Sequence, residues 1–167
     1  MSPKNNLRLP LTQAERTNLR KHKVNISDFL RHALDELAVY LGATPDRTRD
    51  LYALAQFQTI PSIGPKFASD LIFLGYYSLA ELVDKDGAML MDQYEQKKGC
   101  WIDPCVEDQF RLAVHYAQTS DATKTWWDFT PERKAYRSAN GYPRDRPTLA
   151  WHETPAYQRT PDELLTR

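Results

Sequence analysis

The residues with the clearest potential for chemistry lie in one short segment, IPSIGPK, at positions 60–66. The Gly64-Pro65 pair predicts a tight turn that leads into the first turn of a helix. Backbone N–H groups at such a helix start, together with the positive end of the helix dipole, can bind a phosphate. Gly64 allows close approach of a ligand, Lys66 adds a mobile positive charge, and Ile63 should anchor the turn in the core. We therefore predict a phosphate-binding site made of Ser62, Ile63, Gly64 and Lys66.

A weaker copy of this segment precedes it by twenty residues. LGATPDRTRDLYALAQF, from 41 to 57, aligns with PSIGPKFASDLIFLGYY, from 61 to 77, and places Pro45 on Pro65. Each copy is a tight turn, a proline at the first helical position and a short amphipathic helix that must pack on a neighbour to persist. The turn at 41–46 has threonine for the glycine and aspartate for the lysine, so we interpret it as degenerate and mainly structural. Its weak secondary phosphate contacts would come from Gly42, Thr44 and Arg47.

The segment from Ile60 to Gly75 resembles a helix-hairpin-helix motif, and the likeness continues along the chain. IPSIGPKFASDLIFLGYYSLAEL, DGAMLMDQYE, IDPCVEDQFRLAVHYA and WWDF resemble the bacterial pathogenicity-locus helix-hairpin-helix family, often labelled mitomycin-resistance proteins. The resemblance covers roughly residues 55–130. It implies an all-α fold of the DNA-binding type, implies no established reaction, and allows a potassium or sodium ion on hairpin carbonyls when DNA binds. Helix-hairpin-helix motifs commonly have glycine at the position of Ser62, and serine tolerates a positive φ less well.

Lys66 also raises an enzymatic hypothesis. In helix-hairpin-helix DNA glycosylases with lyase activity, a lysine just after the hairpin glycine attacks the sugar, and Lys66 matches that lysine. Such a nucleophile needs its pKa lowered by burial or by nearby positive charge, and PSIGPKFASD supplies no such charge. Asp103, which could assist, precedes Pro104 and is better explained as the N-cap of a helix. We therefore expect no catalytic residue; a borohydride-trapped adduct with abasic-site DNA would contradict this.

Cysteine spacing gives little support to a metal site. Cys100 and Cys105 form a C-x4-C pair with His115 one helix away, whereas zinc sites usually have closer cysteine pairs and four ligands. We predict no metal site and interpret Cys105 as a small buried residue. Two cysteines are too few for a disulfide framework and favour a reducing cytoplasm.

Aromatic and basic residues gather in the C-terminal third. The aromatic side chains could stack on unpaired bases, but we favour packing of this extension on the core, because each covers a large apolar area. The basic side chains could form a strip, but neighbouring acids dilute it and predict an ordinary solvated face. The residues concerned are Trp126, Trp127, Phe129, Tyr136, Tyr142 and Trp151, and Arg133, Lys134, Arg137, Arg144 and Arg146.

Helix signals follow one another along most of the chain. A T-x-x-E capping box at Thr12 predicts a helix over 13–21, and apolar spacing predicts helices over about 28–41, 45–57 and 65–75. Caps at Ser78, Asp86, Asp103 and Thr130 predict four more, the last ending near Asn140. No alternating β-branched run of five residues occurs, so we predict an all-α fold. We expect a flexible arm over 1–10, a tandem helix-hairpin-helix (SAM-like) core over 11–119, and a C-terminal extension over 120–167 that packs on the core and ends in an extended proline-rich tail.

Length and charge limit the possible functions. The chain has 167 residues and equal numbers of basic and acidic residues, 22 of each, which argues against a strongly basic nucleic-acid coat protein. Residues 61–120 carry five basic and nine acidic residues, which should weaken DNA binding. No apolar run approaches the roughly 18 residues of a membrane helix, and no secretory signal opens the chain, so we expect a cytoplasmic protein without a membrane partner.

These observations predict weak, sequence-independent DNA binding through backbone phosphates, in DNA repair or a stress response. The alternative is a protein–protein interaction module in which the hairpin is architectural, and the third hypothesis is the glycosylase/lyase activity of Lys66. We expect no cofactor other than the monovalent cation.

Overall fold

The computed structural model of the chain describes residues 7–158. Within this range the chain forms helices and connecting segments, with a single isolated bridge between Trp101 and Ala150. The predicted all-α class is confirmed. The elements in chain order are α1 (Gln13–Lys21), η1 (Ile26–Arg31), α2 (Leu34–Leu41), α3 (Pro45–Phe57), α4 (Pro65–Phe73), η2 (Leu79–Leu82), α5 (Gly87–Lys98), α6 (Cys105–Thr119), η3 (Trp126–Phe129), α7 (Thr130–Asn140), η4 (Trp151–Glu153) and α8 (Pro155–Gln158), where η denotes a 3-10 helix.

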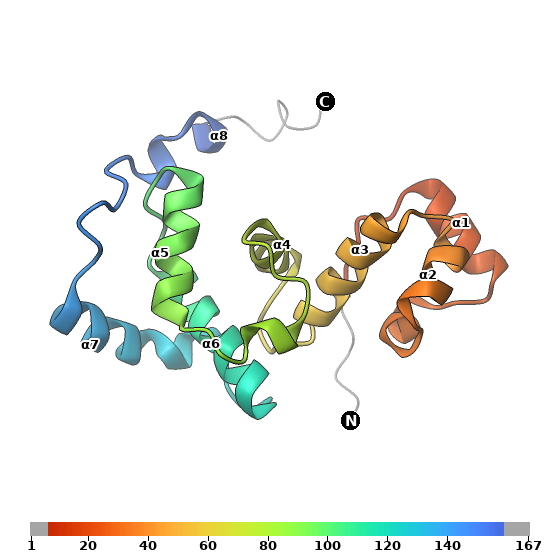
Figure 1. Cartoon of the computed structure of the whole chain (residues 1–167), viewed down its shortest axis with the longest axis horizontal. Helices are drawn as coiled ribbons and strands as arrows, with labels where there is room; N and C mark the ends of the chain where they lie inside the picture. The colour runs from red at the N-terminus through yellow and green to blue at the C-terminus, as the bar shows by residue number, and fades with distance from the viewer. Residues whose placement is uncertain (1–6, 159–167) are drawn as a thin grey trace.

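The molecule is elongated, with α1 to α3 at one end, α5 to α8 at the other and α4 between them (Figure 1). α3 contacts both α2 and α4, so two successive helix–turn–helix units share it. α5 and α6 pack on each other, and α6 also contacts η3 and α7. The tandem helix-hairpin-helix identity of this core stays a prediction.

Local caps explain several helix boundaries. Thr12 and Glu15 form the predicted capping box of α1, with side chain to backbone distances of 3.1 and 2.8 Å. Asp86 accepts a hydrogen bond from the Met89 N–H at the start of α5, and Gly99 ends that helix with a left-handed backbone. Such caps satisfy backbone groups that have no partner inside the helix.

The helix predicted over residues 28–41 is instead two elements. The chain is extended at His32 and Ala33, which separates η1 from α2. Phe29 in η1 is fully buried, and Glu36 accepts a hydrogen bond from the Ala33 N–H at 3.2 Å to start α2 afresh. The break therefore lets Phe29 enter the core while α2 keeps its own capped N-terminus.

One continuous core runs through the molecule. Phe67 of α4 and Tyr94 of α5 both meet the Phe110 ring of α6, with centroids 4.9 and 5.6 Å apart. Edge-on contacts of this kind add to the gain from apolar burial. The described part of the predicted flexible arm belongs to the same core: Leu9 is buried, and the Arg8 backbone exchanges two hydrogen bonds with the Gln58 side chain. That prediction is wrong for residues 7–10, and residues 1–6 lie outside the described range.

The C-terminal extension contains more helix than predicted. Residues 141–150 are irregular, but η4 and α8 follow them, and the Trp101–Ala150 bridge ties this segment to the loop after α5. The end of the predicted tail, residues 159–167, lies outside the described range. Between residues 7 and 158, no helix has the length and apolar character needed to span a bilayer.

Candidate nucleic-acid interface

The segment between α3 and α4 forms the tight turn that its sequence predicts. Ile63 is buried and its N–H donates to the Ile60 carbonyl at 3.2 Å, so it anchors the turn in the core. Ser62 has φ +60, a left-handed conformation that favours glycine. The backbone thus has a shape that glycine adopts more readily, although serine occupies this position.

The N-terminus of α4 has no side-chain cap within the described residues. Gly64 stands at the N-cap position and Pro65 follows at the first helical position. At the start of α3, by contrast, Thr44 Oγ1 accepts a hydrogen bond from the Arg47 N–H at 3.2 Å. The first N–H groups of α4 can therefore donate hydrogen bonds to a ligand. The exposed Lys66 side chain lies in the same helical turn.

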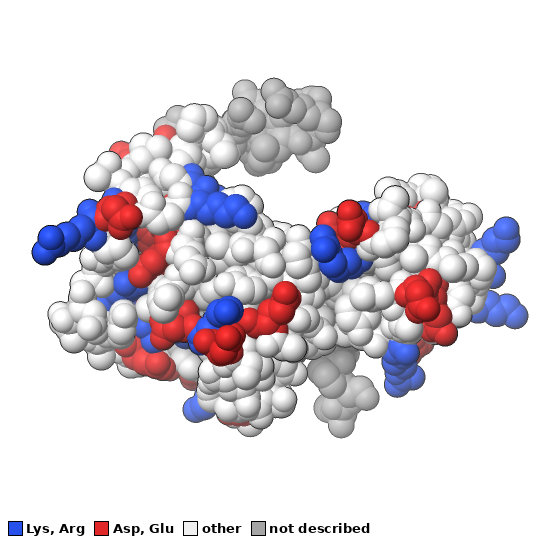
Figure 2. All heavy atoms as spheres, viewed as in Figure 1, with Lys and Arg blue, Asp and Glu red and all other residues white. Residues whose placement is uncertain are grey.

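Two further lysines lie near α4 and were missed as site candidates. Asp70, one turn after Lys66, accepts a hydrogen bond from the Tyr94 hydroxyl at 2.8 Å. Burial raises the pKa of Asp70, while the Tyr94 bond and the charges of Lys98 and Lys66 oppose that rise, so both ammonium groups act on one carboxylate. Lys97 Nζ donates to the Phe73 carbonyl at the end of α4. Figure 2 shows basic side chains at the C-terminal end of α5, on the side that faces α4.

The hydroxyl of Ser62 already has a partner. Its Oγ accepts a hydrogen bond from the Trp126 N–H at 3.1 Å, which holds η3 against the hairpin. Ser62 is therefore available to a phosphate through its backbone rather than through its side chain.

The residues predicted for secondary phosphate contacts are engaged within the protein. Gly42 has φ +64, the same left-handed conformation as Ser62, but the Asn18 amide sits against it and donates to the Leu41 carbonyl at 2.9 Å. The Arg47 guanidinium pairs with the Glu15 carboxylate at 2.9 Å. Since Thr44 also caps its own helix, the copies share a backbone shape but not an open helix start.

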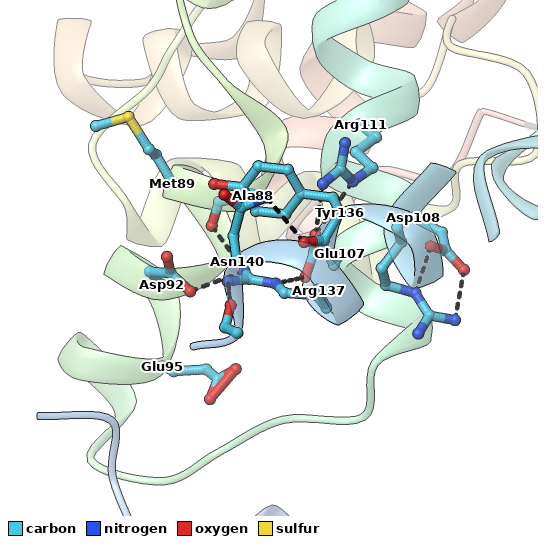
Figure 3. Close-up of polar contacts among 12 residues, drawn as sticks. Ala88, Met89, Asp92, Glu95, Glu107, Asp108, Arg111, Tyr136, Arg137 and Asn140 are labelled. Carbon is cyan, nitrogen blue, oxygen red and sulfur yellow. Dashed lines mark hydrogen bonds and ion pairs between the residues drawn. The ribbon is translucent and has the colours of Figure 1, made fainter. Parts of the chain in front are cut away.

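The predicted basic strip is largely an internal ion-pair network. Arg133 donates to the fully buried Asp108 at 2.6 Å, and Arg137 donates to the fully buried Glu107 and to Asp92, each at 2.8 Å. Figure 3 shows these contacts reaching from α7 to α5 and α6. The prediction of a solvated face is wrong for these arginines, which dock the extension on the core.

The same network removes part of the acidic charge of residues 61–120 from the surface. Arg146 pairs with Glu95, which is 1% exposed, at 2.7 Å. Glu95, Glu107 and Asp108 together are three of the nine acids in residues 61–120, and all are buried against arginines. The surface is therefore less acidic than the sequence count suggests. Lys134 and Arg144 stay exposed and make no ion pair within residues 7–158.

Burial divides the aromatic residues of the extension. Phe129 is buried and Trp126 packs against the core. The Arg146 guanidinium carbon lies 3.6 Å from the centroid of the Tyr142 ring. Trp127 is 55% exposed and Tyr136 is 38% exposed. Packing accounts for most of this group but does not account for Trp127.

The prediction that Cys105 is buried is wrong. Cys105, in the first turn of α6, is exposed, whereas Cys100, in the loop after α5, is buried. Asp103 Oδ1 accepts a hydrogen bond from the Cys105 N–H at 2.9 Å, but α6 begins at Cys105 with Pro104 at its N-cap position, so Asp103 lies one residue before the predicted cap position. In the part of the chain that the structure describes, no three His, Cys, Asp or Glu side chains are grouped to hold a metal ion.

Comparison with known proteins identifies relatives of the central region. A family model described as "Pathogenicity locus" matches residues 50–135, which include the hairpin, α4 to α6 and η3. A protein of Streptomyces lavendulae named "Mitomycin resistance protein McrB" is 31% identical over 86 residues, which are 52% of this chain and 81% of that protein. No solved structure matches. The matched region contains the uncapped start of α4 and leaves out α1 and α2.

Proposed function

The chain belongs to the pathogenicity-locus family, and from this premise we propose that it binds nucleic acid weakly, without sequence preference, through backbone phosphates at the hairpin 60–66. The observation that carries the proposal is the uncapped start of α4 beside the exposed Lys66. Free N–H groups and the positive end of the helix dipole suit a phosphate. Such contacts position a strand and read no bases.

The expected affinity follows from the few cations available. Lys66 and Lys98 both lie close enough to Asp70 to act on its carboxylate. With so few cations near the hairpin, we expect two or three phosphate contacts. These correspond to a log–log salt slope of about −2 to −3, so a fourfold rise in salt should weaken binding by about 15- to 60-fold. Binding of this kind is measurable at low salt and weak at physiological salt.

The test is a fluorescence-anisotropy titration of labelled single- and double-stranded DNA at about 50 and 200 mM salt, the range in which phosphate contacts show. Lys66→Glu should lower affinity about tenfold or more and make the salt slope shallower by about one. Lys134→Glu is the matched control, because Lys134 is also exposed and lies on α7, away from α4 (Figure 1). Equal losses in both variants would point to bulk charge and overturn the proposal.

A methyl group at Gly64 tests the close approach directly. Nothing lies within 4 Å of a Cβ built there, and the φ of −99 is ordinary for alanine. Gly64→Ala should therefore fold normally and still bind less tightly, since the methyl group would stand beside the free N–H groups. Unchanged affinity would place the phosphates elsewhere.

A protein-interaction module is the alternative function. Val83 and Met89 of the segment from η2 to α5 are 46% and 59% exposed, which favours an apolar contact there. Failure of the folded protein to bind any DNA at about 50 mM salt would overturn the phosphate site and leave this alternative.

A further inference from the structure

A largely exposed tryptophan stands beside the hairpin. Trp127 is 55% exposed, whereas Phe129 of the same 3-10 turn is buried. The hydrogen bond from the Trp126 N–H to Ser62 Oγ ties this turn to the hairpin. Trp127 is thus held next to the phosphate site by its immediate neighbour in the chain.

The turn that carries Trp127 is well fixed. Asp128 accepts hydrogen bonds from the Thr125 N–H and hydroxyl at 2.8 and 3.0 Å, which lowers the pKa of Asp128. The charge of Lys124 also lowers the pKa of Asp128. Trp126 and Trp127 meet at an interplanar angle of 85° with centroids 5.3 Å apart. In this edge-to-face arrangement Trp126 covers at most one face of the Trp127 indole, and Trp127 as a whole stays 55% exposed.

We infer that Trp127 is a stacking platform for an unpaired base of the strand whose phosphate binds at α4, an inference that rests on the proposed function. Consecutive Cα atoms are about 3.8 Å apart, so the path from Gly64 through Ser62 and Trp126 to Trp127 spans roughly 10–15 Å. The base on Trp127 and the bound phosphate therefore lie within a few nucleotides of each other on one strand.

Stacking selects the class of nucleic acid. Bases in a continuous duplex are covered on both faces, whereas those of single strands, gaps or overhangs offer a free face to the indole. Every base has such a face, so the contact adds no sequence preference. The ligand class is therefore DNA with unpaired bases.

The test compares an intact single strand of about 20 nucleotides with the same strand carrying abasic sites at its central positions, which keep the phosphates. Wild-type protein should bind the intact strand about 5- to 150-fold more tightly, the range expected for one base–aromatic stack. Trp127→Ala should bring this ratio close to one, and Trp127→Phe should restore part of it. Tyr157→Ala, at an aromatic side chain of α8 that is 58% exposed, should leave it unchanged.

Failure of this inference and failure of the proposed function give different results. Lys66→Glu should lower affinity for both strands by a similar factor and leave the ratio intact. A wild-type ratio near one, or an unchanged ratio in Trp127→Ala with normal helical circular dichroism, would overturn the stacking site alone. Absence of binding to either strand at low salt would overturn both.

Discussion

Loss of the Arg133 guanidinium should destabilise this protein far more than loss of an ordinary surface arginine. Asp108 is fully buried on α6 and accepts hydrogen bonds from Arg133 Nε at 2.6 Å and from Thr130 Oγ1 at 2.7 Å. Arg133→Ala would leave this carboxylate in the core with Thr130 as its remaining partner. An uncompensated buried charge is among the most costly defects that one substitution can make.

The magnitude can be worked out from the burial. Removing one partner of a buried ion pair costs about 3–5 kcal/mol. In a chain of about this size, each kcal/mol lowers the melting midpoint by about 2–4 °C, so a drop of about 6–20 °C is expected. Arg144→Ala is the matched control, because Arg144 is exposed in the same extension and makes no ion pair within residues 7–158; its effect should stay within about 0.5 kcal/mol.

Urea unfolding followed by circular dichroism measures both variants, and limited proteolysis shows whether the segment after α7 is released. The double variant Asp108→Leu with Arg133→Met should recover much of the loss, since it removes both buried charges. Similar unfolding free energies for Arg133→Ala and Arg144→Ala would refute the view that this ion pair docks the extension.

Three further predictions concern other parts of the molecule. Arg47→Ala should lower the free energy of unfolding and leave DNA affinity almost unchanged, because Arg47 is bound to the buried Glu15; a DNA-specific loss would restore Arg47 as a phosphate contact. Gly87→Ala should cost about 1–3 kcal/mol in urea unfolding, since its Cβ would lie 2.8 Å from the Arg111 Cα on α6, and a neutral effect would contradict this close approach. Because burial raises the pKa of Asp70 above the unfolded value, wild-type stability should fall as the pH rises from about 4 through the folded pKa. Asp70→Asn should lack that fall, so its stability relative to wild type should increase with pH; a constant difference would contradict the assignment.

Local signals predicted the starts of α1, α3 and α5, because a cap acts within one helical turn. Thr12, Thr44 and Asp86 each accept a hydrogen bond from the backbone N–H three residues later, where the sequence placed an N-cap. The break at His32 was not predictable in this way. Apolar spacing continues across it, and the burial of Phe29 depends on α3, which contacts η1 from beyond α2.

The candidate site was predictable in its backbone and only partly in its side chains. The positive φ at Ser62 and the burial of Ile63 follow from the turn itself. The hydrogen bond between Ser62 and Trp126 joins residues 64 apart, and no local pattern indicates it. The exposure of Trp127 beside the hairpin depends on that contact and was therefore outside the reach of sequence reasoning.

The sequence by itself determined the all-α class, the tight turn at 60–66 and an α4 that begins with glycine and proline in place of a capping side chain, because these depend on interactions within a few residues. Only the tertiary structure decided which charges face solvent. The ion pairs that join arginines of the extension to Glu95, Glu107 and Asp108 link residues 25 to 51 apart, and they form because the extension packs on α5 and α6. A buried carboxylate needs such a partner. Packing of the extension therefore buried these three acids of the middle segment together with arginines of the extension. Lys66 was left exposed at the open start of α4.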